Sequence, residues 1–237
     1  MKKIAFFVEG QTELIFINKL LLEIAGRKNI GIKLFQLRGG KKSPTQSIFI
    51  PSSQIPPFNP NYEALIYDCG SDEKVKSDIL DQMPSLAAHG YTEIIGIRDL
   101  YPLPLNKLAR LKRGMQYVNP SYLPLPILYE IIIAVHEVET WFLAECSHFE
   151  CIDTKLTNSF VTSKVGYNPC AADVILFPKP VEKLREIYQL VGKGYNKKKD
   201  NVERTVNCLD YENIYLHLRH KIAALNELIT KIDNFLT

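Results

Sequence analysis

The stretch Lys2–Leu22, KKIAFFVEGQTELIFINKLLL, decides the fold of this chain. Its apolar run Ile4–Val8 does not alternate with polar residues, which is typical of a parallel strand buried on both faces. After Gly10, which allows a sharp turn, Thr12 is expected to cap a helix with apolar residues at helical spacing. Glu9 therefore lies at the carboxyl end of a strand, where open α/β sheets bind ligands. On position alone, a solvated turn residue is an equally good interpretation of Glu9.

Length and composition indicate an ordinary globular protein. The chain has 237 residues, of which 46% are hydrophobic and 23% charged, and this suits one large domain or a core domain with an appendage. No apolar run approaches the roughly 18 residues of a membrane span, and the N-terminus lacks the features of a secretory signal. We therefore expect a cytoplasmic protein without membrane contact.

The cysteines are odd in number and irregularly spaced. They are Cys69, Cys146, Cys151, Cys170 and Cys208. Because no CxxC pair is present, the spacing predicts free thiols in place of a zinc site or a disulfide framework.

The distribution of charge is more informative than its sum. The net charge is only +3, which does not by itself indicate a nucleic-acid-binding protein. Basic residues gather at 38–42, 107–113 and 193–199, each time near glycine, which suggests loops. A single basic cluster is usually a solvated surface. The three clusters together with acids at strand ends make a phosphate backbone a more plausible ligand.

Strand and helix patterns alternate along the first 146 residues. The predicted strands are residues 4–8, 32–37, 62–67, 93–97 and 127–135. Helical patterns follow several of them, which is typical of an α/β domain with a parallel or mostly parallel sheet flanked by helices. Residues 38–61 are predicted to form a long loop with an edge strand at 47–50. Residues 147–237 are expected to be a helical extension, with helices at 180–190, at 202–209 and from Tyr211 to the C-terminus.

Acidic residues follow four of the predicted strands. They are Glu9, Asp68, Asp99 and the pair Glu137 and Glu139. Because the carboxyl ends of parallel strands meet at one edge of a sheet, these carboxylates are expected to converge, and converging carboxylates repel unless a cation neutralises them. Hard divalent ions such as Mg²⁺ or Mn²⁺ prefer all-oxygen sites. Helix capping is the alternative role for each acid, and strand order decides whether Asp68 belongs to the site.

Four segments carry a family resemblance. They are FVEGQTE (7–13), IGIRDLYP (95–102), HEVETWFLAE (136–145) and GKGYNKKKD (192–200). In this order they resemble the TOPRIM fold, a Rossmann-like α/β fold, and most closely small stand-alone TOPRIM-like bacterial proteins of unknown function. Those proteins are related to the nuclease domains of the overcoming-lysogenization-defect family. The resemblance spans most of the chain.

The resemblance implies roles for individual residues. Glu9 matches the glutamate after the family's first strand, which is a metal ligand or general base. Asp99 matches the first acid of the family's DxD element. Tyr101 stands where the second acid is expected. This departure implies a relocated ligand (Asp68, Glu137 or Glu139), a weaker second metal site or an inactive fold. Glu139 resembles the later glutamate of the nuclease relatives, and an i, i+2 pair on a regular helix would let only Glu137 or Glu139 face the metal.

Basic residues and one histidine complete the predicted site. His136 is a candidate supporting group or catalytic acid, or equally a structural histidine at a strand end. Lys197 or Lys198 would neutralise charge on a scissile phosphate, with Lys197 the predicted catalytic residue. The residues expected to contact nucleic-acid phosphates are Arg38, Lys41, Lys42, Arg98 and Lys198.

These expectations predict a nuclease, a hydrolase that cleaves phosphodiester bonds in DNA or RNA with Mg²⁺ or Mn²⁺. The resemblance further implies phage defence beside an ABC-type ATPase partner. The alternative is a catalytically inactive TOPRIM-like binding or regulatory module. The predicted domains are an α/β domain at 1–146 and the helical extension at 147–237. The number of metal ions and the formation of a homodimer stay open.

Overall fold

The computed structural model describes residues 1–40, 43–51, 57–120 and 123–237. The chain forms two compact units that interleave along the sequence. The first unit comprises Met1–Arg98, Asn106–Ile133 and Thr230–Thr237, and the second comprises Asp99–Leu105 and Ala134–Ile229. The domain boundary expected at residue 146 stays a prediction.

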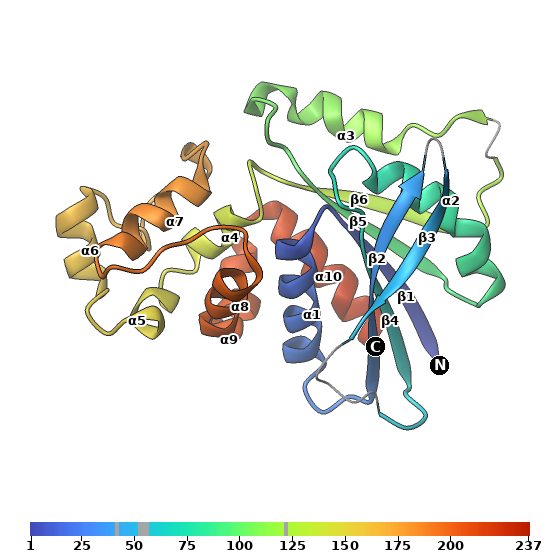
Figure 1. The fold of residues 1–237 in the computed structure, drawn as a ribbon, viewed down its shortest axis with the longest axis horizontal. Coiled ribbons are helices and arrows are strands. Elements are labelled where there is room, and N and C mark those ends of the chain that lie inside the picture. The colour runs from blue at the N-terminus through green and yellow to red at the C-terminus, as the bar shows by residue number, and fades with distance from the viewer. Residues whose placement is uncertain (41–42, 52–56, 121–122) are drawn as a thin grey trace. The chain divides into compact units, whose positions relative to one another are not determined.

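A six-stranded sheet, with strand order β3-β2-β4-β1-β5-β6, organises the first unit (Figure 1). The strands are β1 (Lys2–Val8), β2 (Ile30–Gly40), β3 (Ser43–Ile50), β4 (Tyr62–Asp68), β5 (Glu93–Asp99) and β6 (Leu128–Ala134). β1 pairs in parallel with β4 on one side and with β5 on the other, and its residues Ile4–Val8 are fully buried. The prediction of a central parallel first strand, within a mostly parallel α/β sheet flanked by helices, is confirmed.

The register aligns the ends of the central strands. Val8 lies opposite Asp68 of β4 and opposite Ile97 of β5, so these strands end at the same edge of the sheet. Gly96 in β5 is required by packing, because a Cβ atom there would lie 2.8 Å from Ile131 and 3.0 Å from Ile79. The absence of a side chain at Gly96 therefore lets a helix approach the sheet closely.

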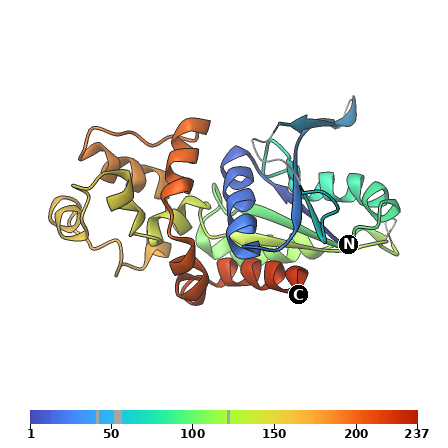
Figure 2. The same ribbon diagram turned by 90° about the horizontal axis from the view of Figure 1, so that it is seen from below.

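Among the described residues, three helices lie wholly in the first unit, and two of them pack on its sheet. They are α1 (Gln11–Ala25), α2 (Val75–Ala88) and α3 (Leu108–Gln116), which follows the short 3₁₀ turn η1 (Leu105–Lys107). Figure 2 shows α1 (blue) beside the strands, where it packs against β2 and β4. The expected cap is wrong by two residues, because Gly10 is the N-cap and Thr12 lies inside the helix, buried. The side chain of Glu13 accepts the Gly10 N–H at 3.0 Å and thereby satisfies a donor that the cap leaves free.

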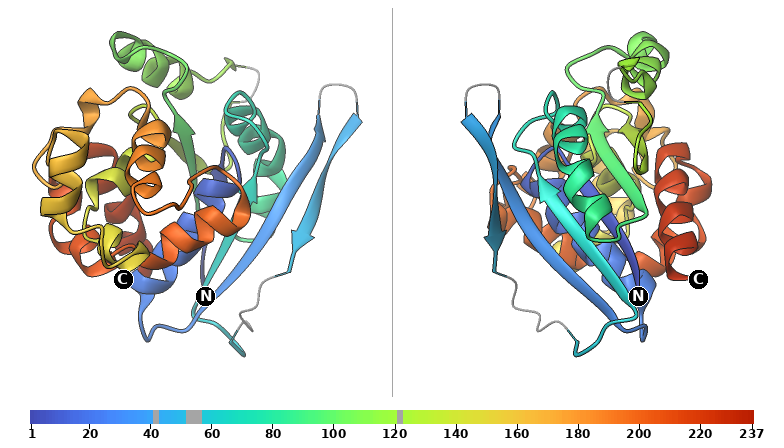
Figure 3. Two further views of the ribbon diagram at one scale, coloured as in Figure 1. Left: turned by 60° about the vertical axis from the view of Figure 1, so that its left-hand side comes forward. Right: turned by 90° about the vertical axis from the view of Figure 1, so that its right-hand side faces the viewer.

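The long loop expected at 38–61 is wrong in its first half. β2 continues to Gly40, and β3 returns antiparallel beside it, with Phe35 opposite Phe49. Figure 3 shows the two strands side by side as a ribbon at one edge of the sheet. The edge strand expected at 47–50 is confirmed and starts earlier, at Ser43. The Gly, Pro and Ser content that predicted a loop is tolerated here because β3 is an edge strand.

The second unit is helical. Its elements are α4 (Glu139–Ala144), α5 (His148–Ile152), α6 (Asn158–Val165), η3 (Val174–Leu176), α7 (Pro180–Gln189), α8 (Lys199–Cys208), α9 (Tyr211–Leu216), η4 (Leu218–His220) and α10 (Ala223–Leu236), whose last turns belong to the first unit. The single helix expected from Tyr211 onward is instead divided into α9, η4 and α10. Large side chains fill the core, namely Trp141, Phe142, Phe149, Tyr188 and Tyr195.

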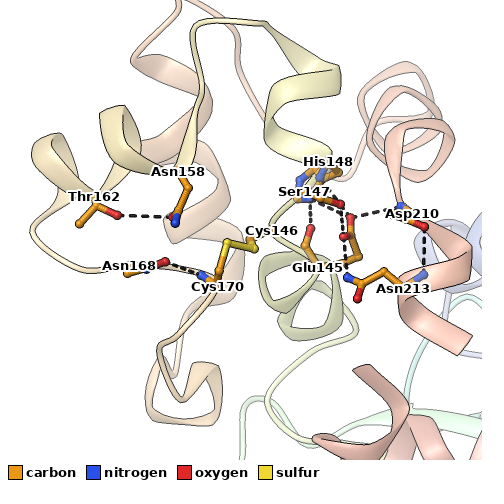
Figure 4. The surroundings of a disulfide bond; sticks show 10 residues. All are labelled: Glu145, Cys146, Ser147, His148, Asn158, Thr162, Asn168, Cys170, Asp210 and Asn213. Atoms are coloured by element: carbon orange, nitrogen blue, oxygen red, sulfur yellow. Dashed lines mark hydrogen bonds and ion pairs between the residues drawn. A yellow bond between two sulfur atoms is a disulfide. The ribbon is translucent and has the colours of Figure 1, made fainter. Parts of the chain in front are cut away.

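Two disulfides link segments of the second unit, so the prediction of free thiols is wrong for four of the five cysteines. Cys146 bonds to Cys170 (Figure 4), and Cys151 bonds to Cys208. Their Cα atoms are 5.3 and 5.5 Å apart, within the usual range for disulfides. The partners are 24 and 57 residues apart in the sequence, so only the fold brings them together. Cys69 is a buried free thiol.

Among the residues that the structure describes, no helix has both the length and the apolar character needed to cross a membrane.

Candidate functional site

The ends of β5 and β6 meet in the second unit through backbone hydrogen bonds. The N–H of Leu100 donates to the carbonyl of Ala134 at 2.9 Å, and the N–H of Tyr101 donates to that of His136 at 2.8 Å. His136 has a φ of 61°, a left-handed conformation that non-glycine residues rarely adopt. Its side-chain Nε2 lies 2.7 Å from the carbonyl of Ile175 and donates a hydrogen bond to it. His136 thus shapes the turn between β6 and α4, and its contact is structural.

Asp99 is fixed by that turn. It is the last residue of β5, and its side chain is 3% exposed. Its Oδ1 accepts the backbone N–H of Val138 at 3.1 Å, at the start of α4. A carboxylate oxygen of Asp99 and one of Glu139 lie within 4.8 Å of each other. Two acids that are 40 residues apart are therefore neighbours in the second unit, as the sequence predicted.

Lys197 lies among the acids. Its Nζ is 2.8 Å from Glu137 Oε1, 3.4 Å from Glu139 Oε2 and 3.9 Å from Asp99 Oδ2. Both glutamates reach the same ammonium because Glu137 precedes the first turn of α4, so regular helical spacing does not apply to the pair. We call Asp99, Glu137, Glu139 and Lys197 the acid cluster.

Burial and the neighbouring charges shift the pKa values of Glu139 and Lys197 in the acid cluster. Burial raises the pKa of Glu139, which has no exposed surface, and the neighbouring charge of Glu137 raises it further, while the charge of Lys197 opposes both. Burial lowers the pKa of Lys197, but the charges of Glu139 and Asp99 and the hydrogen bond to Glu137 outweigh it, so this pKa lies above its usual value. Lys197 is therefore positively charged at neutral pH, and its charge favours the ionised form of Glu139 against the effect of burial.

Tyr195 is a member of the site that sequence reasoning missed. Its buried hydroxyl donates to Glu139 Oε1 at 3.1 Å. The other oxygen, Oε2, is buried and makes no hydrogen bond with any described group. The signal was present in the motif GKGYNKKKD, in which an aromatic residue stands between a glycine and the basic run. The motif alone does not assign a role to the hydroxyl, because aromatic residues at such positions are more often part of the core.

The remaining predicted acids lie in the first unit. Glu9 directly follows β1 and is half-buried. Asp68, at the end of β4, is buried, and its Oδ1 accepts the Gly70 N–H at 2.8 Å. Burial raises the pKa of Asp68, while hydrogen bonds from Gly70 and Gln36 lower it. Asp68 thus has a local role in the turn after β4.

The predicted phosphate-binding residues differ in their surroundings. The Arg38 guanidinium is exposed and donates to Gln36 Oε1 at 2.9 Å. The Arg98 side chain is only 13% exposed and forms an ion pair with Asp72 at 3.1 Å, which leaves little of it for a ligand. Lys198 is exposed. Lys41 and Lys42 lie outside the described residues.

A pocket of about 600 Å³ lies elsewhere, in the first unit. It is lined by residues near the starts of β5 and β6 and by Lys231, which pairs with Glu130 at 2.8 Å and Glu93 at 3.5 Å. None of its described lining residues is a predicted site residue.

Comparisons with models of known protein families, with curated proteins and with solved structures gave no match.

Proposed function

We propose that this chain is a divalent-metal-dependent nuclease that hydrolyses phosphodiester bonds in DNA or RNA. The observation that carries the proposal is the charge of the acid cluster. Asp99, Glu137 and Glu139 are all buried, and among the described residues the ion pairs of these three carboxylates converge on one ammonium, that of Lys197. Burying unbalanced charge is costly, and a divalent cation would supply the missing positive charge.

The donor set fits Mg²⁺ or Mn²⁺. These hard ions prefer carboxylate oxygens, and the buried Oε2 of Glu139 has no hydrogen bond from any described donor. When bound, such an ion lowers the pKa of a water molecule and stabilises charge on phosphate oxygens. Asp99 and Glu139 would hold the ion, and Val138 and Tyr195 would orient them through the hydrogen bonds described above. Lys197 would neutralise a phosphate oxygen.

The TOPRIM resemblance also assigns a role to Glu9, as a metal ligand or general base; Glu9 lies in the first unit. Glu13 is the buried acid of the same segment, with 3% of its surface exposed, and it is part of the FVEGQTE motif. A comparison of Glu9→Gln with Glu13→Gln decides which of the two affects cleavage.

Two observations favour an inactive binding or regulatory module as the second candidate. Tyr101, at the position of the second DxD acid, has 53% of its surface exposed and brings no carboxylate. Lys197 also partly balances the acids without a metal ion. Such a module would bind nucleic acid or a protein partner without cleaving it.

The wider setting is proposed from the resemblance alone. It comprises a TOPRIM-like fold, a role in phage defence, an ABC-type ATPase partner, a homodimer and a cytoplasmic location. The disulfides stand against the last of these, because disulfides are rare in the cytosol.

A cleavage assay tests the proposed function. Plasmid DNA, single-stranded DNA and transfer RNA are incubated with the protein and Mg²⁺ or Mn²⁺, and with EDTA in place of the metal. We expect metal-dependent cleavage of at least one substrate that Asp99→Asn and Glu139→Gln abolish. Glu182→Gln is the matched control, since Glu182 is 57% exposed on the same unit and should leave cleavage unchanged. Cleavage that survives Asp99→Asn would refute the assignment.

A further inference from the structure

The ammonium of Lys197 occupies the position that a metal ion would need. It contacts one oxygen of each of the three acids, at 2.8 to 3.9 Å. A divalent ion held by Asp99 and Glu139 would bind their carboxylate oxygens at about 2.0–2.6 Å. Two cations cannot share these oxygens without strong repulsion. The acid cluster can therefore hold the ammonium or a metal ion in that position, but not both.

The backbone around Lys197 is held in place by the second unit. Arg185 Nε donates to the carbonyl of Tyr195 at 3.2 Å, and Arg204 donates to that of Gly194. Asn201 Nδ2 also donates to Asn196 Oδ1 at 2.8 Å, directly before Lys197. These contacts fix the segment that carries Lys197 independently of the acids.

The side chain of Lys197, in contrast, has access to solvent. It is 42% exposed, while the carboxylates that it contacts are nearly buried. A lysine side chain has a flexible stem of four carbons. Its ammonium can therefore move several ångströms while its backbone stays in place. Part of the side chain thus reaches solvent, toward which the ammonium would move on leaving the acids.

We propose that Lys197 is a built-in counter-ion that a divalent metal ion displaces. This inference rests on the proposed metal site and adds a regulatory step to it. Without metal, the ammonium neutralises part of the charge of Asp99, Glu137 and Glu139 and occupies the position of the metal ion. Metal binding releases the ammonium, which is then free to pair with a phosphate group of the substrate. Metal affinity and the position of Lys197 are thus coupled.

The wild-type protein tests this coupling directly. An N-hydroxysuccinimide ester acetylates accessible lysines, and mass spectrometry quantifies acetylation at each position. We expect saturating Mn²⁺ to raise the acetylation rate of Lys197 severalfold relative to KCl of the same ionic strength. The exposed neighbours Lys198 and Lys199 serve as internal controls and should not change. An unchanged or lower rate at Lys197, with Mn²⁺ bound, would overturn the inference and leave the proposed metal site standing.

A variant gives an independent readout. Lys197→Met keeps much of the aliphatic side chain and removes the charge, so Mn²⁺ should bind about tenfold more tightly than in the wild type, within the usual range of coupling between ligands. Lys198→Met is the matched control and should bind like the wild type. Equal or weaker binding by Lys197→Met than by the wild type overturns the inference alone.

Two further outcomes bear on the proposed function as well. If only Lys197→Met binds Mn²⁺, and the binding is lost when Glu139→Gln is added, the ammonium excludes the metal ion and is not displaced by it, so the inference and the proposed function both fail. If neither protein binds Mn²⁺, the proposed function and the inference both fail. Should Lys197→Met not fold, the acetylation of the wild type decides the inference.

Discussion

The Nζ of Lys197 lies 3.4 Å from Oε2 of Glu139, a carboxylate without exposed surface. The two residues are 58 positions apart, one in a glycine-containing loop before α8 and the other at the start of α4. Buried charges are normally paired, and this pair is one of three that join Lys197 to acids. The proposed metal site rests on this arrangement, in which three buried carboxylates surround one lysine ammonium.

Asp99→Asn should abolish metal-dependent cleavage with little effect on folding. The amide oxygen of asparagine can still accept the N–H of Val138, so the turn after β6 keeps its hydrogen bond. The charge that would hold the metal is lost. Cleavage rates and the thermal unfolding midpoint measure the two effects. A large fall in the midpoint would mean that Asp99 is mainly structural.

Tyr195→Phe should lower the free energy of unfolding by about 1–2 kcal/mol, because it removes the hydrogen bond to a buried carboxylate. Tyr167→Phe is the matched control. The Tyr167 hydroxyl is buried and has no hydrogen-bond partner among the described residues, so its removal should cost nothing. Urea unfolding of the wild type, Tyr195→Phe and Tyr167→Phe measures the change in the free energy of unfolding for each variant. Equal stability of wild type and Tyr195→Phe would show that the hydroxyl does not stabilise Glu139.

The stability of the second unit should fall as the pH falls below about 6.5, the ordinary pKa of histidine. His148 is buried between the Glu145 carbonyl and the Tyr188 hydroxyl, which lies 2.8 Å from its Nε2. Burial lowers the pKa of His148, which outweighs the opposing effect of its contacts with Glu145. The unfolded chain therefore binds a proton at a pH where the folded chain does not, and stability is fully present only above the unfolded pKa.

Urea unfolding between pH 5 and pH 8 measures this dependence, in wild type and His148→Gln. The variant should show a smaller slope of unfolding free energy against pH. His220→Gln, which changes an exposed histidine, should keep the wild-type slope. Identical slopes in wild type and His148→Gln would contradict the prediction.

Reduction of the disulfide between Cys151 and Cys208 should destabilise the protein by about 2–4 kcal/mol, because the bond closes a long loop of the chain. The Cys151→Ser/Cys208→Ser variant should show this loss by urea unfolding. Thiol titration of the denatured, unreduced wild type should find one thiol, Cys69. Five thiols in that titration would show that the chain is made without disulfides.

The parallel core of the fold was predictable because each buried strand carries an unbroken apolar run. KKIAFFV has no polar position after Lys3, and this pattern fits only a strand covered on both faces. The ribbon of β2 and β3 was predicted only in part, because SPTQSIFI contains residues that are as common in loops as in edge strands. The disulfides were not predictable, since pairing across 24 and 57 residues depends on tertiary contacts.

The residues of the candidate site were predictable where an acidic side chain follows a predicted strand. Asp99 and Glu139 were found because each follows a strong apolar strand, and Lys197 because its motif resembles a known one. Tyr195 was not found, since a buried aromatic side chain gives the same sequence signal whether its hydroxyl is used or not. The ion pair between Arg98 and Asp72 was also missed, because it depends on where a turn places Asp72.

Calorimetric titration with Mn²⁺ tests the central claim most directly. The account predicts that the wild type binds Mn²⁺ specifically, that Glu139→Gln weakens binding by at least about tenfold, equivalent to about 1.4 kcal/mol, and that Glu182→Gln binds like the wild type. Wild-type binding that Glu139→Gln leaves unchanged, or no binding to the wild type, would contradict the claim that these carboxylates form a metal site.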